Sequence, residues 1–239
     1  MRMRRKAWTE PELSACTYYI ESPSGHRGQW KPLFEKEQPI HLEIGCGKGV
    51  GTVKMVHDNP NVNYIAVDEV RHVLAVLIRN AQAEFDGEIP KNLLLAPVNA
   101  EYIHDTFSIE DGIERIYINF CNPWDEKAKH HKRRLTHPRQ LAQYRTFLKE
   151  DGEIWFKTDN DALFEASRGY FTESGFEIRY ETDDLHASGF SPNYVTEHEA
   201  MFTKRGMKIH FLIAKMLPSD APAFEPVVIT PQPRFRNPK

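Results

Sequence analysis

The stretch that most constrains this chain is residues 41–49, where a short apolar strand leads directly into closely spaced glycines. Leu42 and Ile44 alternate with polar neighbours, as residues of a β-strand do. Glycine adopts backbone conformations that other residues avoid, and it leaves room for a ligand beside the main chain. Residues 50–58 are suited to a helix, so the stretch predicts a ligand bound at a helix N-terminus.

Strand-length and helix-length patterns alternate from residue 39 onward. The chain has 239 residues, 40% of them hydrophobic, which is enough for one large core. Such alternation predicts a parallel sheet with helices on both faces and ligands at the carboxyl ends of the strands. The expected strands are 41–44, 64–68, 93–96, 115–120, 152–158, 176–181 and 208–215. The expected helices are 50–58, 71–85, 138–149 and a segment that Asp159 caps and that ends near Gly175.

The two ends of the chain differ in composition from its middle. Residues 1–38 begin with a basic cluster and contain several turn-forming residues, so we expect a surface arm, followed by a catalytic domain over 39–217. Residues 218–239 contain six prolines and are expected to form a flexible tail. The three cysteines lack metal or disulfide spacing, and no apolar segment follows the basic cluster. We therefore expect a reduced, cytoplasmic protein without metal, signal peptide or membrane span.

Three ligands suit a glycine-rich turn of this kind. A mononucleotide P-loop needs Ser or Thr after its Gly-Lys pair, whereas Gly49 follows Lys48. A dinucleotide fingerprint needs a glycine where Val50 stands. The remaining pattern, an acidic residue followed by glycines at every second position, resembles the first motif of class I S-adenosylmethionine-dependent methyltransferases.

That resemblance gives roles to polar residues at three strand ends. Glu43 is expected to hold the methionine ammonium of the cofactor, directly or through a local network, while Gly45 and Gly47 make room for the methionine part. Asp68 can accept both ribose hydroxyls, and such charged hydrogen bonds contribute about 1.5–3 kcal/mol each. Asn99 is expected at the adenine edge. The alternative is an ordinary strand–helix turn with solvated strand ends.

A basic segment follows the fourth expected strand. In class I methyltransferases the end of this strand faces the transferable methyl, which places Asn122 where the chemistry occurs. A chain of net charge -3 that gathers cations at this point is expected to bind a polyanion through its phosphates. The alternative is a solvated basic helix face. The cations are Lys127, Lys129, Lys132, Arg133 and Arg134.

Several motifs in order resemble the bacterial tRNA (guanine-N7-)-methyltransferase family over roughly residues 39–216. The resemblance implies a seven-stranded, mostly parallel class I methyltransferase fold. It also implies methyl transfer from S-adenosylmethionine to N7 of a guanosine in the tRNA variable loop, at position forty-six. The motifs are residues 42–49, 119–120 with 123–124, 131–136, 156–160 and 196–199 before Phe202.

The resemblance also implies a substrate site. Asp159 and the run Thr196, Glu197, His198 and Glu199 are expected to contact the target guanosine, with Lys127 as a pocket lysine. Glu199 could accept from the N1 and N2 donors of guanine, which would exclude adenine. Guanine N7 carries a lone pair and no proton, so alignment without a general base is the main task. Carboxylates would stabilise the positive charge that the purine gains. A helix cap is the alternative role for Asp159.

The sequence departs from the family pattern at the expected active centre. Asn122 stands where the family usually has Asp, and it remains a candidate for both catalysis and cofactor contact. An amide can orient by hydrogen bonds but cannot offset positive charge, so either Asp159 and Glu199 supply that charge or turnover is slow. Asp125 and Glu126 replace the usual Pro-Lys, and one extra residue separates Trp124 from Lys132, so the pocket lysine is expected within one or two positions of Lys127.

Two other functions remain open at this level. A small-molecule methyltransferase would keep the cofactor residues without using the basic segment. A catalytically weak tRNA-binding relative would bind tRNA without turnover, and Asn122 favours it. We expect a monomer or homodimer, with no membrane contact.

Overall fold

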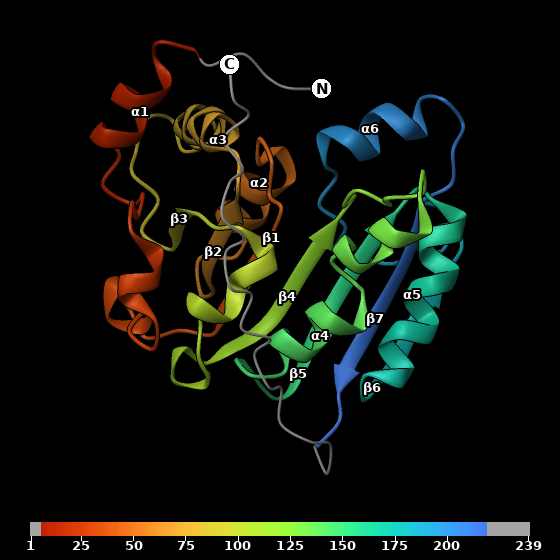
Figure 1. The fold of residues 1–239 in the computed structure, drawn as a ribbon. Helices are drawn as coiled ribbons and strands as arrows, with labels where there is room; N and C mark the ends of the chain where they lie inside the picture. The colour runs from red at the N-terminus through yellow and green to blue at the C-terminus, as the bar shows by residue number, and fades with distance from the viewer. Residues whose placement is uncertain (1–5, 219–239) are drawn as a thin grey trace, which may run out of the picture.

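The computed structural model describes residues 6–218, and seven strands in this range form one sheet in the order β3-β2-β1-β4-β5-β7-β6 (Figure 1). Strands β1 to β5 pair in parallel, whereas β7 runs antiparallel to both β5 and β6. The predicted seven-stranded, mostly parallel sheet is confirmed. The strands are β1 (Ile40–Ile44), β2 (Asn63–Asp68), β3 (Leu93–Pro97), β4 (Ile113–Asn119), β5 (Leu148–Thr158), β6 (Phe176–Thr182) and β7 (His210–Met216).

Helices cover both faces of the sheet. Phe156 of β5 stacks on Phe164 of α5, with ring centroids 6.4 Å apart. The neighbouring Trp155 and Lys157 point to the opposite face, which α2 and residues 185–196 cover. In Figure 1, α4 and α5 lie together on one side, and α6 lies beyond the arrowhead of β4. The helices are α1 (Thr9–Ala15), α2 (Val50–Asp58), α3 (Arg71–Glu84), α4 (Pro138–Tyr144), α5 (Asp161–Glu173) and α6 (Glu197–Thr203).

The N-terminal region is part of the core, so the prediction of a surface arm is wrong for residues 6–38. Trp30 is fully buried; its backbone N–H donates to Asp111 Oδ1 at 3.0 Å and its indole Nε1 donates to the Thr106 carbonyl at 3.0 Å. Leu13 of α1 is also buried, where α1 packs against α3. The prolines and glycines here shape a loop that lies against the body of the protein. The predicted tail at 218–239 falls almost entirely outside the described residues.

The N-terminus of α5 differs from the prediction by one residue. Asn160, not Asp159, caps the helix, because Asn160 Oδ1 accepts from the Leu163 backbone N–H at 2.7 Å. Asp159 therefore lies between the end of β5 and the cap, half-buried. This position keeps its carboxylate at the carboxyl edge of the sheet without a capping role.

Among residues 6–218, no helix combines the length and apolar character that a membrane crossing requires. Over the same residues, no cluster of three or more His, Cys, Asp or Glu side chains is arranged to hold a metal ion.

Candidate active site

A cavity of about 470 Å³ opens at the carboxyl ends of the strands, next to the glycine turn. Gly45 lines it after β1, Asp68 at the end of β2, Asn99 after β3 and Asn122 after β4. Four of the six predicted cofactor residues therefore line one cavity. Glu69, which the sequence analysis did not single out, lines it as well, and its position directly after Asp68 was the available signal.

Asp68 joins the glycine turn to the second strand. Its Oδ2 accepts from the Gly47 backbone N–H at 3.0 Å, and its Oδ1 accepts from the Val70 N–H at 2.8 Å. Burial raises the pKa of the Asp68 carboxyl, and these two hydrogen bonds act against that rise. Each carboxylate oxygen has a second lone pair. Asp68 can therefore accept hydroxyl donors from a ribose while it holds the turn.

The turn itself needs glycine at defined points. Gly45 has φ +77°, and a Cβ added there would meet only Leu135, at 3.9 Å. Gly49 has φ +67°, and its added Cβ would lie 2.3 Å from Leu77 Cγ of α3. Gly49 therefore lets the start of α2 approach α3 closely, while Gly45 leaves the cavity side open. The cavity suits S-adenosylmethionine. Asp68 offers a carboxylate to a ribose diol, Asn99 offers an amide at the far end, and the main chain between them is uncrowded.

Glu43 lies outside this cavity, on the opposite face of β1. It is buried and accepts from the Thr52 hydroxyl at 2.5 Å and from Asn119 Nδ2 at 2.9 Å. Burial raises the pKa of the Glu43 carboxyl. A direct contact with a cofactor ammonium in the cavity does not fit this placement. The structure instead connects Glu43 to the cavity indirectly. Glu43 accepts from Asn119, and Asn119 precedes Phe120, which lines the cavity.

The chain turns sharply after β4, with two bulky residues in left-handed conformations. Phe120 and Trp124 both have φ +53°, and both line the cavity. Such conformations cost of order 1–3 kcal/mol each and persist where the surroundings enforce them. Here the Phe120 N–H donates to the Lys157 carbonyl at 2.9 Å, and Asn122 Oδ1 accepts from the Trp124 N–H at 2.9 Å. Asn122 thus fixes the turn, and its amide group remains exposed.

The basic segment after this turn separates into exposed and buried cations. Lys127, Lys129, Lys132 and Arg133 are exposed, and the last two line the cavity. Arg134 is only 3% exposed. Its guanidinium donates to the Pro123 carbonyl at 2.7 Å and to Asp125 at 2.9 Å. The prediction that Arg134 binds RNA is therefore wrong, because its donors stabilise the turn from inside.

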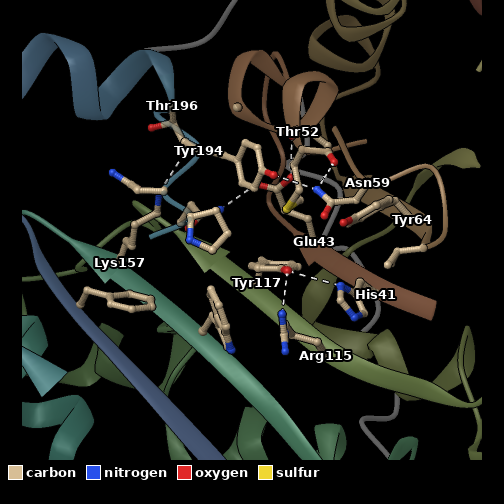
Figure 2. A pocket seen from close by; sticks show the side chains of 18 of the residues that line it. His41, Glu43, Thr52, Asn59, Tyr64, Arg115, Tyr117, Lys157, Tyr194 and Thr196 are labelled. Carbon is tan, nitrogen blue, oxygen red and sulfur yellow. Dashed lines mark hydrogen bonds between the residues drawn. The ribbon is translucent and has the colours of Figure 1, made fainter. Parts of the chain in front are cut away.

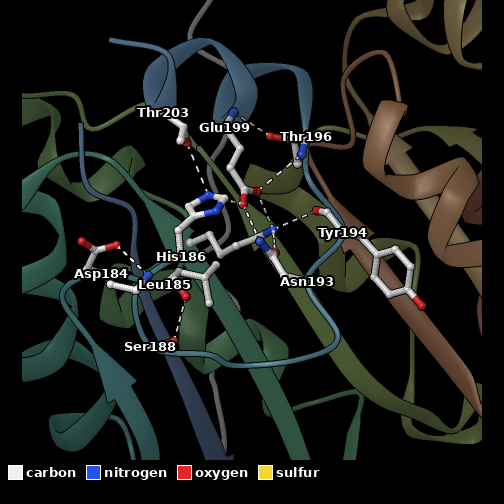
Figure 3. Close-up of polar contacts among 11 residues, drawn as sticks. Asp184, Leu185, His186, Ser188, Asn193, Tyr194, Thr196, Glu199 and Thr203 are labelled. Carbon is white, nitrogen blue, oxygen red and sulfur yellow. Dashed lines mark hydrogen bonds and ion pairs between the residues drawn. The ribbon is translucent and has the colours of Figure 1, made fainter. Parts of the chain in front are cut away.

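The predicted substrate motif forms the N-terminus of α6. Thr196 caps the helix in a reciprocal capping box with Glu199. The Glu199 carboxylate is fully buried and accepts from Lys157 Nζ at 2.8 Å and from Asn193 Nδ2 at 2.6 Å. His186 Nε2 lies 3.1 Å from Glu199 Oε1 (Figure 3). The expected contact of Glu199 with the guanine edge is therefore wrong for this conformation. Glu199 instead anchors α6 and the preceding segment to β5.

The other residues of the motif face the cavity side. Glu197 pairs with Lys48 of the glycine turn at 2.9 Å. The ring of His198 lies nearly parallel to that of Phe120, at 16°, with centroids 6.4 Å apart. These contacts bring the N-terminus of α6 to the end of β4. Lys157 and Phe120 are residues whose roles the sequence analysis missed, although both lie in motifs that it quoted.

Comparison with solved structures identifies the fold. The chain resembles the 16S rRNA methyltransferase KamB with a TM-score of 0.58 at 14% identity, over 80% of this chain and 93% of that one. It resembles an antibiotic-related methyltransferase with a TM-score of 0.55 at 18% identity, over 83% and 96% of the two chains. Together with the cavity at the strand ends, these matches define a class I, Rossmann-like methyltransferase fold.

Sequence comparison then specifies the family. A family model described as a putative methyltransferase matches residues 37–212. A tRNA (guanine-N(7)-)-methyltransferase of Clostridium botulinum is 52% identical over 216 residues, covering 90% of this chain and 98% of the relative. Its counterpart from Clostridium perfringens is 53% identical, covering 91% and 100%. The chain belongs to the tRNA (guanine-N7-)-methyltransferase family, which confirms the resemblance seen in its motifs.

Proposed function

We propose that this chain transfers the methyl group of S-adenosylmethionine to N7 of a guanosine in the tRNA variable loop, at position forty-six. The observation that carries the proposal is the meeting of three features at one edge of the sheet. They are the cavity with Asp68 and Asn99, the exposed cations Lys132 and Arg133 on its wall, and the N-terminus of α6 beside it. The names of the curated relatives agree with it.

The cofactor supplies an electrophilic methyl group when bound. Asp68 would accept the ribose hydroxyls, Gly45 would lie along the methionine part, and Asn99 would meet the adenine edge. N7 of guanine attacks through its lone pair and loses no proton, so the protein needs to align the base and need not deprotonate it. Alignment of this kind supplies a large part of the rate enhancement.

Asn122 is uncharged and cannot offset the positive charge of the methylated purine. Another side chain must stabilise that charge. Glu199 is paired with Lys157, and Asp125 is paired with Arg134, so neither carries an unbalanced negative charge. Asp159 is half-buried and directly follows β5. The Lys157 carbonyl of the same strand accepts the Phe120 N–H. We assign the electrostatic role to Asp159.

The decisive experiment incubates the protein with unmodified tRNA and methyl-labelled S-adenosylmethionine. Label at N7 of the variable-loop guanosine supports the proposal, and a transcript with adenosine at that position should remain unlabelled. Asp68→Asn should lower cofactor affinity, and Asp159→Asn should lower turnover with cofactor affinity retained. Label at a different atom would refute the assigned reaction.

A second function, a tRNA-binding protein with little turnover, is favoured by Asn122 alone. This hypothesis predicts tight tRNA binding, little label and a gain of activity in Asn122→Asp. A small-molecule methyltransferase would instead show no tRNA binding. The exposed Lys132 and Arg133 on the cavity wall disfavour a small-molecule methyltransferase.

A further inference from the structure

A second cavity, of about 190 Å³, lies on the opposite face of the sheet from the cofactor cavity. Strands β1, β4 and β5 form its floor, α2 forms one side, and residues 185–196 cover it (Figure 2). Among the predicted site residues only Glu43 and Thr196 line it. We propose that this cavity binds one uncharged, planar heterocyclic base.

The walls of the cavity are largely aromatic, which favours a flat ligand. Any of the bases can stack on such rings, because every base has a π-face. The volume is below the roughly 300 Å³ at which pockets for drug-sized ligands begin. A single base therefore fits better than a nucleotide. The aromatic residues are Tyr64, Tyr117, Trp155, Phe190, Tyr194 and Phe211.

Arg115 provides an unused hydrogen-bond donor. Its guanidinium lies over the Trp155 ring, 4.2 Å from the centroid, and its Nη2 pairs with Glu153 at 2.9 Å. Its Nη1 lies 3.4 Å from the Tyr117 hydroxyl, which is a weak contact. The buried Nε has no hydrogen-bond partner among residues 6–218. A buried donor without a partner is costly, and a ring carbonyl would satisfy it.

The cavity lining offers no unpaired cation to an anionic ligand. Arg115 is paired with Glu153, and Lys157 is paired with Glu199 at 2.8 Å. Glu43 is hydrogen-bonded, and burial raises its pKa. His41, at the Arg115 end, has its pKa lowered to about 3 by burial and by the Arg115 charge, so it is neutral near pH 7. A phosphate would gain little here, whereas a neutral base loses little on desolvation.

The rim of the cavity suggests two sources of such a base. Residues 192–196 form part of the lining and lead directly into α6, the proposed RNA-binding side of the protein. The base could be a free molecule or an unstacked nucleotide of the RNA other than the target. The RNA source rests on the proposed function, whereas binding of a free base does not.

The free-base experiment titrates hypoxanthine into the protein saturated with S-adenosylhomocysteine, which fills the cofactor cavity. We expect one binding site and quenching of Trp155 fluorescence that is lost in Trp155→Phe. Unsubstituted purine, which lacks the carbonyl, should bind at least tenfold more weakly. Arg115→Met should cause a similar loss, whereas Arg179→Met, an exposed arginine on β6, should cause none.

The second variant and the RNA experiment complete the test. Val62→Phe fills the cavity from its half-buried rim and should abolish hypoxanthine binding even if Arg115→Met fails to fold. Photo-crosslinking of 4-thiouridine-substituted tRNA to residues 190–196 would identify RNA as the source, with or without free-base binding. Absence of both hypoxanthine binding and crosslinks, or hypoxanthine binding unchanged in Val62→Phe, would overturn the proposal in favour of a water-filled cavity.

Discussion

At the residue scale, the buried pair of Lys157 and Glu199 holds the segment before β7 in place. Removing one partner of such a pair leaves an uncompensated buried charge and typically costs about 3–5 kcal/mol. Lys157→Met should lower the free energy of unfolding by about that amount in urea titrations. Adding Glu199→Leu should restore much of the loss, because the buried charge is then gone. The exposed pair of Lys48 and Glu197 is the matched control, and Lys48→Met should cost at most about 1 kcal/mol.

Variants of Arg133 and Arg134 test whether the exposed cations of the basic segment bind RNA while the buried one stabilises the fold. Arg133→Ala should weaken tRNA binding and reduce the slope of log affinity against log salt by about 1, because one phosphate contact is lost. Its unfolding free energy should stay within about 0.5 kcal/mol of the wild type. Arg134→Ala should instead destabilise the protein, because the Pro123 carbonyl and Asp125 lose their donor. Equal salt slopes in the two variants would contradict this division.

At the scale of elements, local patterns predicted the seven strands and the helices α2, α3 and α5, because alternation and helical spacing are properties of short stretches. The helix expected at 138–149 ends at Tyr144, and α1 and α6 were not predicted. The buried N-terminal region was missed, since Trp30 is stabilised by contacts with Asp111, far along the chain. Arg134 was misread because burial of one cation within a charged run depends on its contacts with the preceding turn, at Pro123 and Asp125. Glu43 shows the converse: its alternation with Ile44 already implied that the two side chains face opposite sides of the sheet.

The glycine turn allows a matched test at this scale. Gly47 and Gly49 both have left-handed backbones, so alanine costs about 1 kcal/mol of conformational strain at either position. At Gly49 the added methyl also collides with Leu77, whereas at Gly47 it meets nothing within 4 Å. Gly49→Ala should therefore lower the unfolding free energy and S-adenosylhomocysteine affinity clearly more than Gly47→Ala, as measured by urea titration and calorimetry. Equal effects would show that the approach of α2 to α3 is adjustable.

At the scale of the whole molecule, one sheet separates two cavities of different character. The cofactor cavity lies where the order of strands reverses between β1 and β4, as expected for open α/β sheets. The second cavity lies between the central strands and α2, and residues 185–196 close it. Strand β4 contributes to both, through Asn119 on one face and Phe120 at its end. Ligands on the two faces would therefore contact two adjacent residues, the last one of β4 and the one that follows it.

Burial of His41 in the second cavity also makes the stability of the whole molecule depend on pH. Its pKa is lowered to about 3, mainly by burial and further by the Arg115 charge, whereas an unfolded histidine titrates near 6.5. Between these values the unfolded chain binds a proton that the native protein does not, so His41 makes stability fall as the pH falls. The slope approaches about 1.4 kcal/mol per pH unit. His41→Asn should remove this contribution, seen as the difference between the unfolding free energies of the two proteins from pH 7 to pH 4. A difference that stays constant over that range would contradict this prediction, because the pKa of His41 would then be the same in the native and the unfolded protein.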